Sequence, residues 1–293
     1  MAQSILIRQQ PAAARDRQRA PSNIKSIILH VQDDGEVDER LHAALLLARA
    51  AQAHLRCVHV TPAEAYVSMK SFGGVFTLEK AIHEVDAREA QLRAHIEGLL
   101  QCEDVSWDYE QVTGNPVRLM IQRSALCDIM ITGRPVHRAL GDRPNSAGLG
   151  EILLNIGIPL LVCGGADWHF DPLGPAVIAW NGSFEAANAV RAAIGLLKLA
   201  SEVRVIRYSE DKRNMFADSQ IMDFLSRHGI DGELDVREAR RDFSDDLVEY
   251  ASMYGAGYIV MGAYSHSRAS EILFGGVTRD LLHGCPVSLV LSR

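Results

Sequence analysis

The chain has 293 residues, which is long enough for two domains of ordinary size, each with its own hydrophobic core. Apolar residues make up 47% and charged residues 23% of the chain, as in a soluble globular protein, and no apolar run approaches the roughly 20 residues of a membrane helix. The five cysteines are scattered and form no Cys-x-x-Cys pair. Four of them lie in or beside apolar runs and indicate buried free thiols in a reducing compartment, so we expect a cytoplasmic protein without a disulfide framework or a zinc site.

The net charge of −7 is unevenly distributed along the chain. Residues 1–24 contain four arginines and one aspartate, so the remaining body carries ten net negative charges. Such an acidic body is a poor nonspecific binder of nucleic acid, and we expect no nucleic-acid partner. The leading 24 residues lack an apolar period and are predicted to form a disordered tail, with an Arg-rich transit peptide as the alternative.

The first half of the body is predicted to alternate strands and helices. A β-branched run over 25–31 predicts a strand buried on both faces, and the helix after it, over 38–53, has Asp38 placed to cap it. A second strand covers 55–60 and precedes an extra segment at 61–77. The later elements of this half are a long amphipathic helix (78–100), a strand (105–112), a helix (116–125), a strand (128–132), a helix from near Glu151 and a last strand (159–163).

The second half repeats this order. Its predicted strands cover 176–180, 202–208, 232–238, 258–261 and 286–291. Its predicted helices cover 185–199, 215–228 and 244–254, with one more helix before the last strand. Strands regularly separated by helices indicate right-handed crossovers and a parallel sheet covered on both faces.

Matching residues support a duplication. Gly133 and Gly262 follow the fourth strand of each half, and Pro159 and Pro286 begin the fifth. The turn-rich segment 164–175 lies between the halves. We therefore expect two α/β domains, at 25–165 and 175–293, after a tail at 1–24.

The stretch after the strand at 258–261 is the most specific motif. Gly262 ends the strand, a loop containing Ser265 follows, and Gly275 and Gly276 open a helix that continues through Val277 and Thr278. Amide N–H groups and the helix dipole at such a start favour an anion, and glycine lets a ligand approach the main chain. The sequence therefore predicts a phosphate-binding loop in the second half.

This spacing resembles the signature of the universal stress protein family, in which Gly, two residues, Gly, nine residues and Gly precede Ser or Thr. Ser265 stands where the second Gly is expected, and Gly276 stands at the Ser/Thr position. The chain looks like the tandem form of that family. The resemblance implies two flavodoxin-like or Rossmann-like domains, each a five-stranded parallel sheet with helices on both faces, which pair through their last strands. Whether two whole chains also form a homodimer stays open.

The resemblance also implies an adenine nucleotide, ATP or AMP, in the second domain, with or without Mg²⁺. Asn181 stands where the family usually has Asp at the nucleoside, and a main-chain group near Ile206 would meet the adenine. The residues implied around the phosphates are Gly262, Ser265, Gly275, Gly276, Val277 and Thr278. The first domain breaks the spacing after Gly133, and Pro135 removes an amide donor, so we expect that domain to be a structural partner or to bind something else.

No constellation for bond-breaking chemistry is present in the sequence. It contains no Gly-x-Ser-x-Gly elbow, no Gly-x-x-x-x-Gly-Lys-Ser/Thr loop and no His pair with metal spacing, so we assign neither catalytic residues nor a metal site. We expect a stress-response protein that binds nucleotide without significant catalysis. The alternatives are a scaffold or a binder of small molecules or lipid with the same fold, and a slow ATPase with a carboxylate near Thr278.

Overall fold

A computed structural model describes residues 22–63, 75–134, 146–163, 168–209, 215–238, 242–263 and 276–293. The predicted tail lies almost wholly outside these residues, as do Ser265, Gly275 and most of the extra segment at 61–77. Residues 22–163 are called the first half below, and residues 168–293 the second half.

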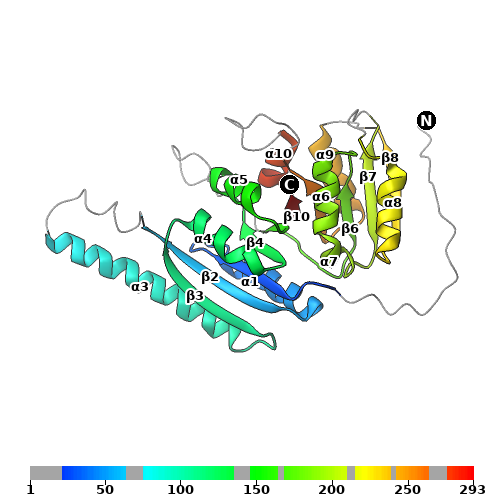
Figure 1. Ribbon diagram of the computed structural model, residues 1–293. Helices are drawn as coiled ribbons and strands as arrows, with labels where there is room; N and C mark the ends of the chain where they lie inside the picture. The colour runs from blue at the N-terminus through cyan, green and yellow to red at the C-terminus, as the bar shows by residue number, and fades with distance from the viewer. Residues whose placement is uncertain are drawn as a thin grey trace.

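The strands of both halves form one sheet in the order β3-β2-β1-β4-β5-β10-β9-β6-β7-β8 (Figure 1). The strands of the first half are β1 (Ser26–Val31), β2 (His54–Pro62), β3 (Trp107–Gly114), β4 (Ile129–Gly133) and β5 (Leu160–Cys163). Those of the second half are β6 (Ala176–Ala179), β7 (Val203–Tyr208), β8 (Gly232–Arg237), β9 (Tyr258–Gly262) and β10 (Ser288–Ser292). Every pairing within a half is parallel.

Each half has the strand order 3-2-1-4-5 when its own strands are counted in chain order. This is the order of doubly wound, Rossmann-like sheets, and it confirms the predicted α/β fold class. The two halves meet at β5 and β10, which pair antiparallel with Leu289 opposite Val162. Because this pair is antiparallel, the strands of the two halves run in opposite directions. Their carboxyl ends therefore lie at opposite ends of the strands in the common sheet, and the line of carboxyl ends in each half is called its carboxyl edge below.

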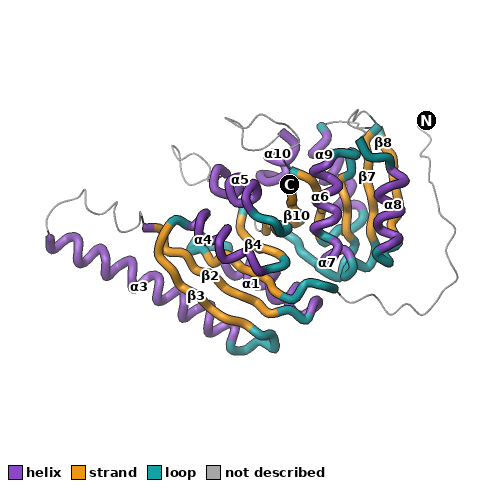
Figure 2. Tube along the Cα trace, in the orientation of Figure 1, coloured by secondary structure: helices purple, strands orange, loops and turns teal. Residues whose placement is uncertain are grey.

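Helices cover both faces of this sheet (Figure 2). The first half contributes α1 (Val37–Ala51), α3 (Val75–Leu100), α4 (Pro116–Arg123), the short 3₁₀ turn η2 (Ser124–Leu126) and α5 (Ser146–Asn155). The second half contributes α6 (Phe184–Ala192), α7 (Ile194–Leu197), α8 (Asp218–Arg227), α9 (Phe243–Met253) and α10 (Gly276–Gly284).

Two apolar cores follow from these crossovers, one on each face of the sheet. One core joins side chains of α1, α3, α6, α7 and α8. The other joins side chains of α4, α5, α9 and α10. In each half the chain passes from its first strand to the outermost strand and then returns across the sheet. The helices formed before the return therefore lie on one face, and those formed after it lie on the other.

Two local predictions were wrong. Asp38 does not cap α1, because Glu36 occupies the N-cap position without a side-chain hydrogen bond; Asp38 lies in the first turn, with Oδ1 2.7 Å from His95 Nε2. The helix predicted over 185–199 is broken at Ala193, which has ψ near zero and separates α6 from α7. Ser183 caps α6, because its Oγ accepts a hydrogen bond from the Ala186 amide at 3.2 Å.

Candidate functional site

The carboxyl edge of β6 and β9 is the place where the strand order of the second half reverses. The two strands are neighbours, with Ala179 opposite Met261. The chain leaves β6 into α6 on one face and leaves β9 toward α10 on the other. Doubly wound sheets bind ligands at this kind of crevice, and the predicted residues Asn181 and Gly262 both lie at its edge.

Asn181 shapes the turn that follows β6. Its Oδ1 accepts a hydrogen bond from the Ser183 amide at 3.1 Å, and Gly182 has φ +69°, a conformation that favours glycine. The carbonyl of Gly182 accepts hydrogen bonds from the amides of Met215 and Phe216 at 3.1 and 3.0 Å. This bond uses one of the two lone pairs of the Asn181 side-chain oxygen, so its N–H₂ group and the second lone pair of that oxygen are the parts that could serve a ligand.

Ile206 lies inside β7 instead of at its end. It is opposite Ala179 on one side and Asp235 on the other. Its carbonyl accepts a hydrogen bond from the Trp180 amide at 2.9 Å, and the strand continues to Tyr208. The Ile206 carbonyl is therefore engaged in the sheet, and its role toward an adenine stays a prediction.

Gly262 is required by the packing of α6. A Cβ atom at this position would lie 2.4 Å from the carbonyl carbon of Glu185 and 2.6 Å from the amide nitrogen of Ala186. Both are backbone atoms in the first turn of α6, so no side-chain rotation could make room. The close approach that the sequence predicts at Gly262 is an approach by the protein's own helix.

The start of α10 lies at the same edge. Gly276 is exposed, and a Cβ atom there would have no neighbour within 4 Å among the residues that the structure describes, which do not include 264–275. Val277 is half-buried against the apolar core, and Thr278 is 5% exposed. The first amides of a helix have no partner within that helix, and the macrodipole makes this end positive.

The corresponding place in the first half is filled by an arginine. Arg40 of α1 is fully buried, and its Nη2 donates hydrogen bonds to Asp34 Oδ1 at 2.8 Å and to the Gln32 carbonyl at 3.1 Å. A Cβ atom on Gly133 would lie 2.7 Å from Arg40 Nη1. A guanidinium thus occupies the space above the strand where α6 places its backbone in the second half.

Arg134 follows Gly133 and reaches into the second half. Its Nη2 donates a hydrogen bond to the carbonyl of Val287 at 3.1 Å. Burial lowers the pKa of Arg134, while nearby Cys285, Cys163 and Glu36 favour its charged form. This contact helps to fix the two halves to each other.

A buried histidine network links β2, β3 and α3. His59 Nε2 lies 2.7 Å from Glu89 Oε2, and the Tyr109 hydroxyl lies 2.8 Å from His59 Nδ1. Burial lowers the pKa of His59 in spite of the opposing effect of Glu89, and burial raises the pKa of Tyr109. A phenol whose ionisation is suppressed is not an activated nucleophile, so the network ties these elements together.

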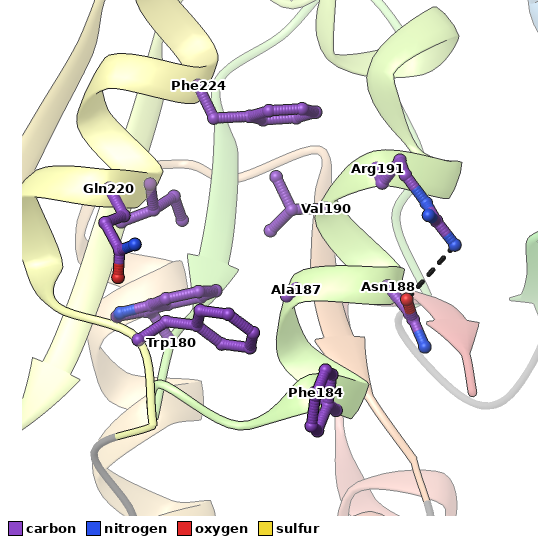
Figure 3. A pocket seen from close by; sticks show the side chains of 10 residues that line it. Trp180, Phe184, Ala187, Asn188, Val190, Arg191, Gln220 and Phe224 are labelled. Carbon is purple, nitrogen blue, oxygen red and sulfur yellow. Dashed lines mark hydrogen bonds between the residues drawn. The ribbon is translucent and has the colours of Figure 1, made fainter.

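A cavity of about 280 Å³ lies between α6 and α8 (Figure 3). Its lining residues are Trp180, Phe184, Ala187, Asn188, Val190, Arg191, Phe216, Gln220, Ile221 and Phe224. This cavity was not predicted from the sequence. Its walls come from the end of β6, from α6 and from α8 with the residue Phe216 before it, and the sequence pattern does not define how these elements sit relative to one another.

No group of three or more His, Cys, Asp or Glu side chains suited to hold a metal ion occurs among the described residues. Within the same residues, no helix combines the length and the apolar character needed to cross a membrane.

The fold is shared with universal stress proteins of known structure, although no family model and no curated protein matches the sequence. A universal stress protein from Archaeoglobus fulgidus has a TM-score of 0.64 and 14% identity, and the match covers 92% of this chain and 96% of that one. A putative universal stress protein from Pseudomonas aeruginosa has a TM-score of 0.52 and 16% identity, covering 92% and 93%. A functionally unknown protein from Pseudomonas aeruginosa PAO1 has a TM-score of 0.54 and 16% identity, covering 92% of each chain. The chain therefore has the universal stress protein fold over nearly its whole length, as the sequence predicts.

Proposed function

We propose that this chain is a universal stress protein that binds an adenine nucleotide, ATP or AMP, in its second half without significant turnover. The observation that carries the proposal is the exposed start of α10 at the carboxyl edge of β6 and β9. Gly276 is exposed there, a Cβ on it would meet no described residue within 4 Å, and the strand order reverses at the same edge. These are the features that favour phosphate beside a helix N-terminus.

In this proposal, different residues at the carboxyl edge contact different parts of the nucleotide. The main chain from Gly275 to Thr278 holds the phosphates together with Ser265, and the amide of Asn181 contacts the ribose or the base. Gly262 acts indirectly, because it allows α6 to sit directly on β9. Mg²⁺ would accompany the phosphates without a dedicated group of protein carboxylates, since the described residues contain none.

The proposal extends to the organisation of the chain. The two domains are residues 25–165 and 175–293, the first a structural partner and the second the binding domain. The pairing of β5 with β10 supports this division, because it covers the inner edges of both five-stranded sheets. The protein acts in the cytoplasm, has no nucleic-acid partner, and a homodimer would be formed through surfaces other than this strand pair.

Calorimetry with ATP, ADP and AMP, each with and without Mg²⁺, tests the proposal. The wild type is expected to bind at least one of them with a micromolar dissociation constant and to release no product above the buffer rate. Gly276→Glu should weaken binding at least about tenfold through repulsion of the phosphates, while a carboxylate at the helix start stabilises the fold by about 0.5 kcal/mol.

Gly284→Glu is the matched control for this variant. Gly284 ends the same helix, is exposed, and would place its Cβ more than 4 Å from every atom of the described residues around it. It adds the same charge at the opposite end of α10, where it should leave nucleotide affinity unchanged. Absence of heat with all three nucleotides, or equal affinities in the two variants, would overturn the proposal.

A protein of the same fold that binds another small molecule or lipid, or serves as a scaffold, is the second candidate. Two observations favour it. The side-chain oxygen of Asn181 and the main-chain carbonyl of Ile206 each accept a hydrogen bond from within the protein, and an apolar cavity lies beside α6. Failure of calorimetry with every nucleotide, together with a co-purifying non-nucleotide ligand, would establish this candidate in place of the first.

A further inference from the structure

The outer side of β8 is a free sheet edge within the described part of the chain. β8 is the last strand of the sheet on the side of the second half (Figure 1), and it pairs there with β7. The Ser209 amide donates a hydrogen bond to the Arg237 carbonyl at 2.8 Å, so the main-chain groups of Arg237 point toward β7. Because main-chain groups alternate in direction along a strand, those of Leu234 and Val236 point to the free edge. Such a row of unpaired groups can accept one more strand.

The chain that precedes β1 comes from the second half. Ser22 Oγ donates a hydrogen bond to the carbonyl of Gly195 in α7 at 2.8 Å, and Ile24 belongs to the apolar core that α7 shares. The hydroxyl of Tyr258 in β9 donates to a carbonyl of α7 at 3.0 Å, so α7 lies at the amino end of β9. Residues 1–21, which lie outside the described residues, therefore join the structure on the side of β1 that leads to β8 and away from β3.

The length of this segment is sufficient to reach β8. Three strand spacings separate β9 from β8 in the sheet order, which is roughly 15 Å, and a helix layer adds roughly 10 Å. Arg8 and Ser22 are 14 positions apart in the sequence, and an extended chain of that length spans up to about 45 Å. The residues before Arg8 can therefore lie along β8 without any change in the contacts of Ser22.

Residues 4–8 have the composition of a strand, and their surroundings carry the opposite charge to β8. Their sequence is Ser-Ile-Leu-Ile-Arg, in which β-branched and large apolar residues favour a strand, and Pro11 limits that strand to the residues before it. Residues 1–21 contain four arginines and one aspartate, a net charge of +3. Residues 215–238, which include α8 and β8, contain six acidic residues and two arginines, a net charge of −4. Attraction between the two segments favours their association.

We propose that residues 4–8 pair with the free edge of β8 as an additional strand and close the sheet on that side. The pairing is antiparallel, because such a strand ends at the amino end of β8, on the side of the sheet where α7 lies. Residues 9–21 then return directly to Ser22. The added strand covers main-chain groups that would otherwise be available to the edge strand of a second copy of the chain.

Hydrogen exchange of the β8 amides in the full chain, followed by NMR, tests this proposal. The outward amides of Leu234 and Val236 should exchange at least about tenfold more slowly in the full chain than in a chain that lacks residues 1–20, because each donates a hydrogen bond to the added strand. Ile7→Asp should abolish this protection, since it removes a β-branched residue and brings a carboxylate to an acidic edge. Ala13→Asp is the matched control, because it adds the same charge outside residues 4–8 and should keep the protection.

Both substitutions and the deletion leave the residues of the two halves unchanged, and the amides of Asp235 and Arg237, which face β7, serve as the internal reference. Equal exchange of Leu234 and Val236 in the full and shortened chains would overturn the proposal, as would protection that persists in Ile7→Asp. Protection that rises with protein concentration would assign the edge to a second copy of the chain. Protection gained along β3 in place of β8 would assign the segment to the opposite edge, and either of these results would also overturn the proposal.

Discussion

Replacement of Gly262 by alanine tests how the second half is held together. The added Cβ would lie 2.4 to 2.7 Å from three backbone atoms of Glu185 and Ala186, whereas ordinary van der Waals contact begins near 3.4 Å. The first turn of α6 would have to move away from β9 by about 1 Å. Overpacking of this kind typically costs 1–3 kcal/mol, and because backbone alone must yield we expect about 3 kcal/mol.

Urea denaturation followed by circular dichroism measures this effect as a shift of the unfolding midpoint. Gly276→Ala is the neutral control, since its Cβ meets none of the described residues within 4 Å, and it should change the free energy of unfolding by less than about 1 kcal/mol. Gly133→Ala should cost about 1 kcal/mol, because the atom it meets is the end of the Arg40 side chain. A Gly262→Ala protein within about 0.5 kcal/mol of wild type would refute the packing argument.

Three further substitutions test individual contacts. Arg40→Ala should destabilise the first half by about 3 kcal/mol in the same urea assay, because it leaves the nearly buried carboxylate of Asp34 without its cation. An equally large loss of stability in Arg40→Met would show that the effect comes from the missing charge and not from the missing volume. Ser183→Ala should cost about 1 kcal/mol through loss of the helix cap on the Ala186 amide, and no change in the urea midpoint would contradict that role. Burial lowers the pKa of His30 to about 3, so the unfolded state binds more protons than the folded state below about pH 6.5, and the free energy of unfolding falls as the pH drops. Between pH 7 and pH 5, the free energy of unfolding of His30→Leu should fall by about 2 kcal/mol less than that of the wild type. Parallel pH profiles of the two proteins would show this to be wrong.

The fold was largely predictable because a parallel strand buried on both faces corresponds to a nearly continuous run of apolar residues in the sequence. The run over 25–31 consists mostly of apolar residues, and as β1 it is buried along almost its whole length. The long helix predicted from 78 to 100 forms α3, since its apolar residues recur at helical spacing over many turns. The predicted element order gave the parallel topology, because right-handed crossovers leave few alternatives.

The details that escaped prediction depend on contacts between residues far apart in the chain. Arg40 follows the polar start of α1, and only its position above Gly133 explains why it is buried. The reason for glycine at 262 likewise lies in the first turn of α6, some 77 residues earlier. Sequence spacing indicated that the main chain is approached closely there, but it could not distinguish a ligand from a helix.

The candidate site was predictable in position but not in detail. The end of β6 and the start of α10 do lie at one edge of the sheet, as the repeated α/β pattern requires. The use of the Asn181 oxygen in a turn and the interior position of Ile206 depend on strand ends, which patterns locate only to within a few residues. The aromatic cavity was missed because its walls come from three elements whose relative positions only the folded chain defines.

The most direct test of the central claim is to follow the backbone amide signals of ¹⁵N-labelled protein during a titration with ATP. We expect saturable shifts of the signals of Gly276, Val277 and Thr278 together with the side-chain amide of Asn181, and none around Gly133. Shifts confined to the first half or to the α6–α8 cavity, or no shifts at millimolar ATP, would contradict it.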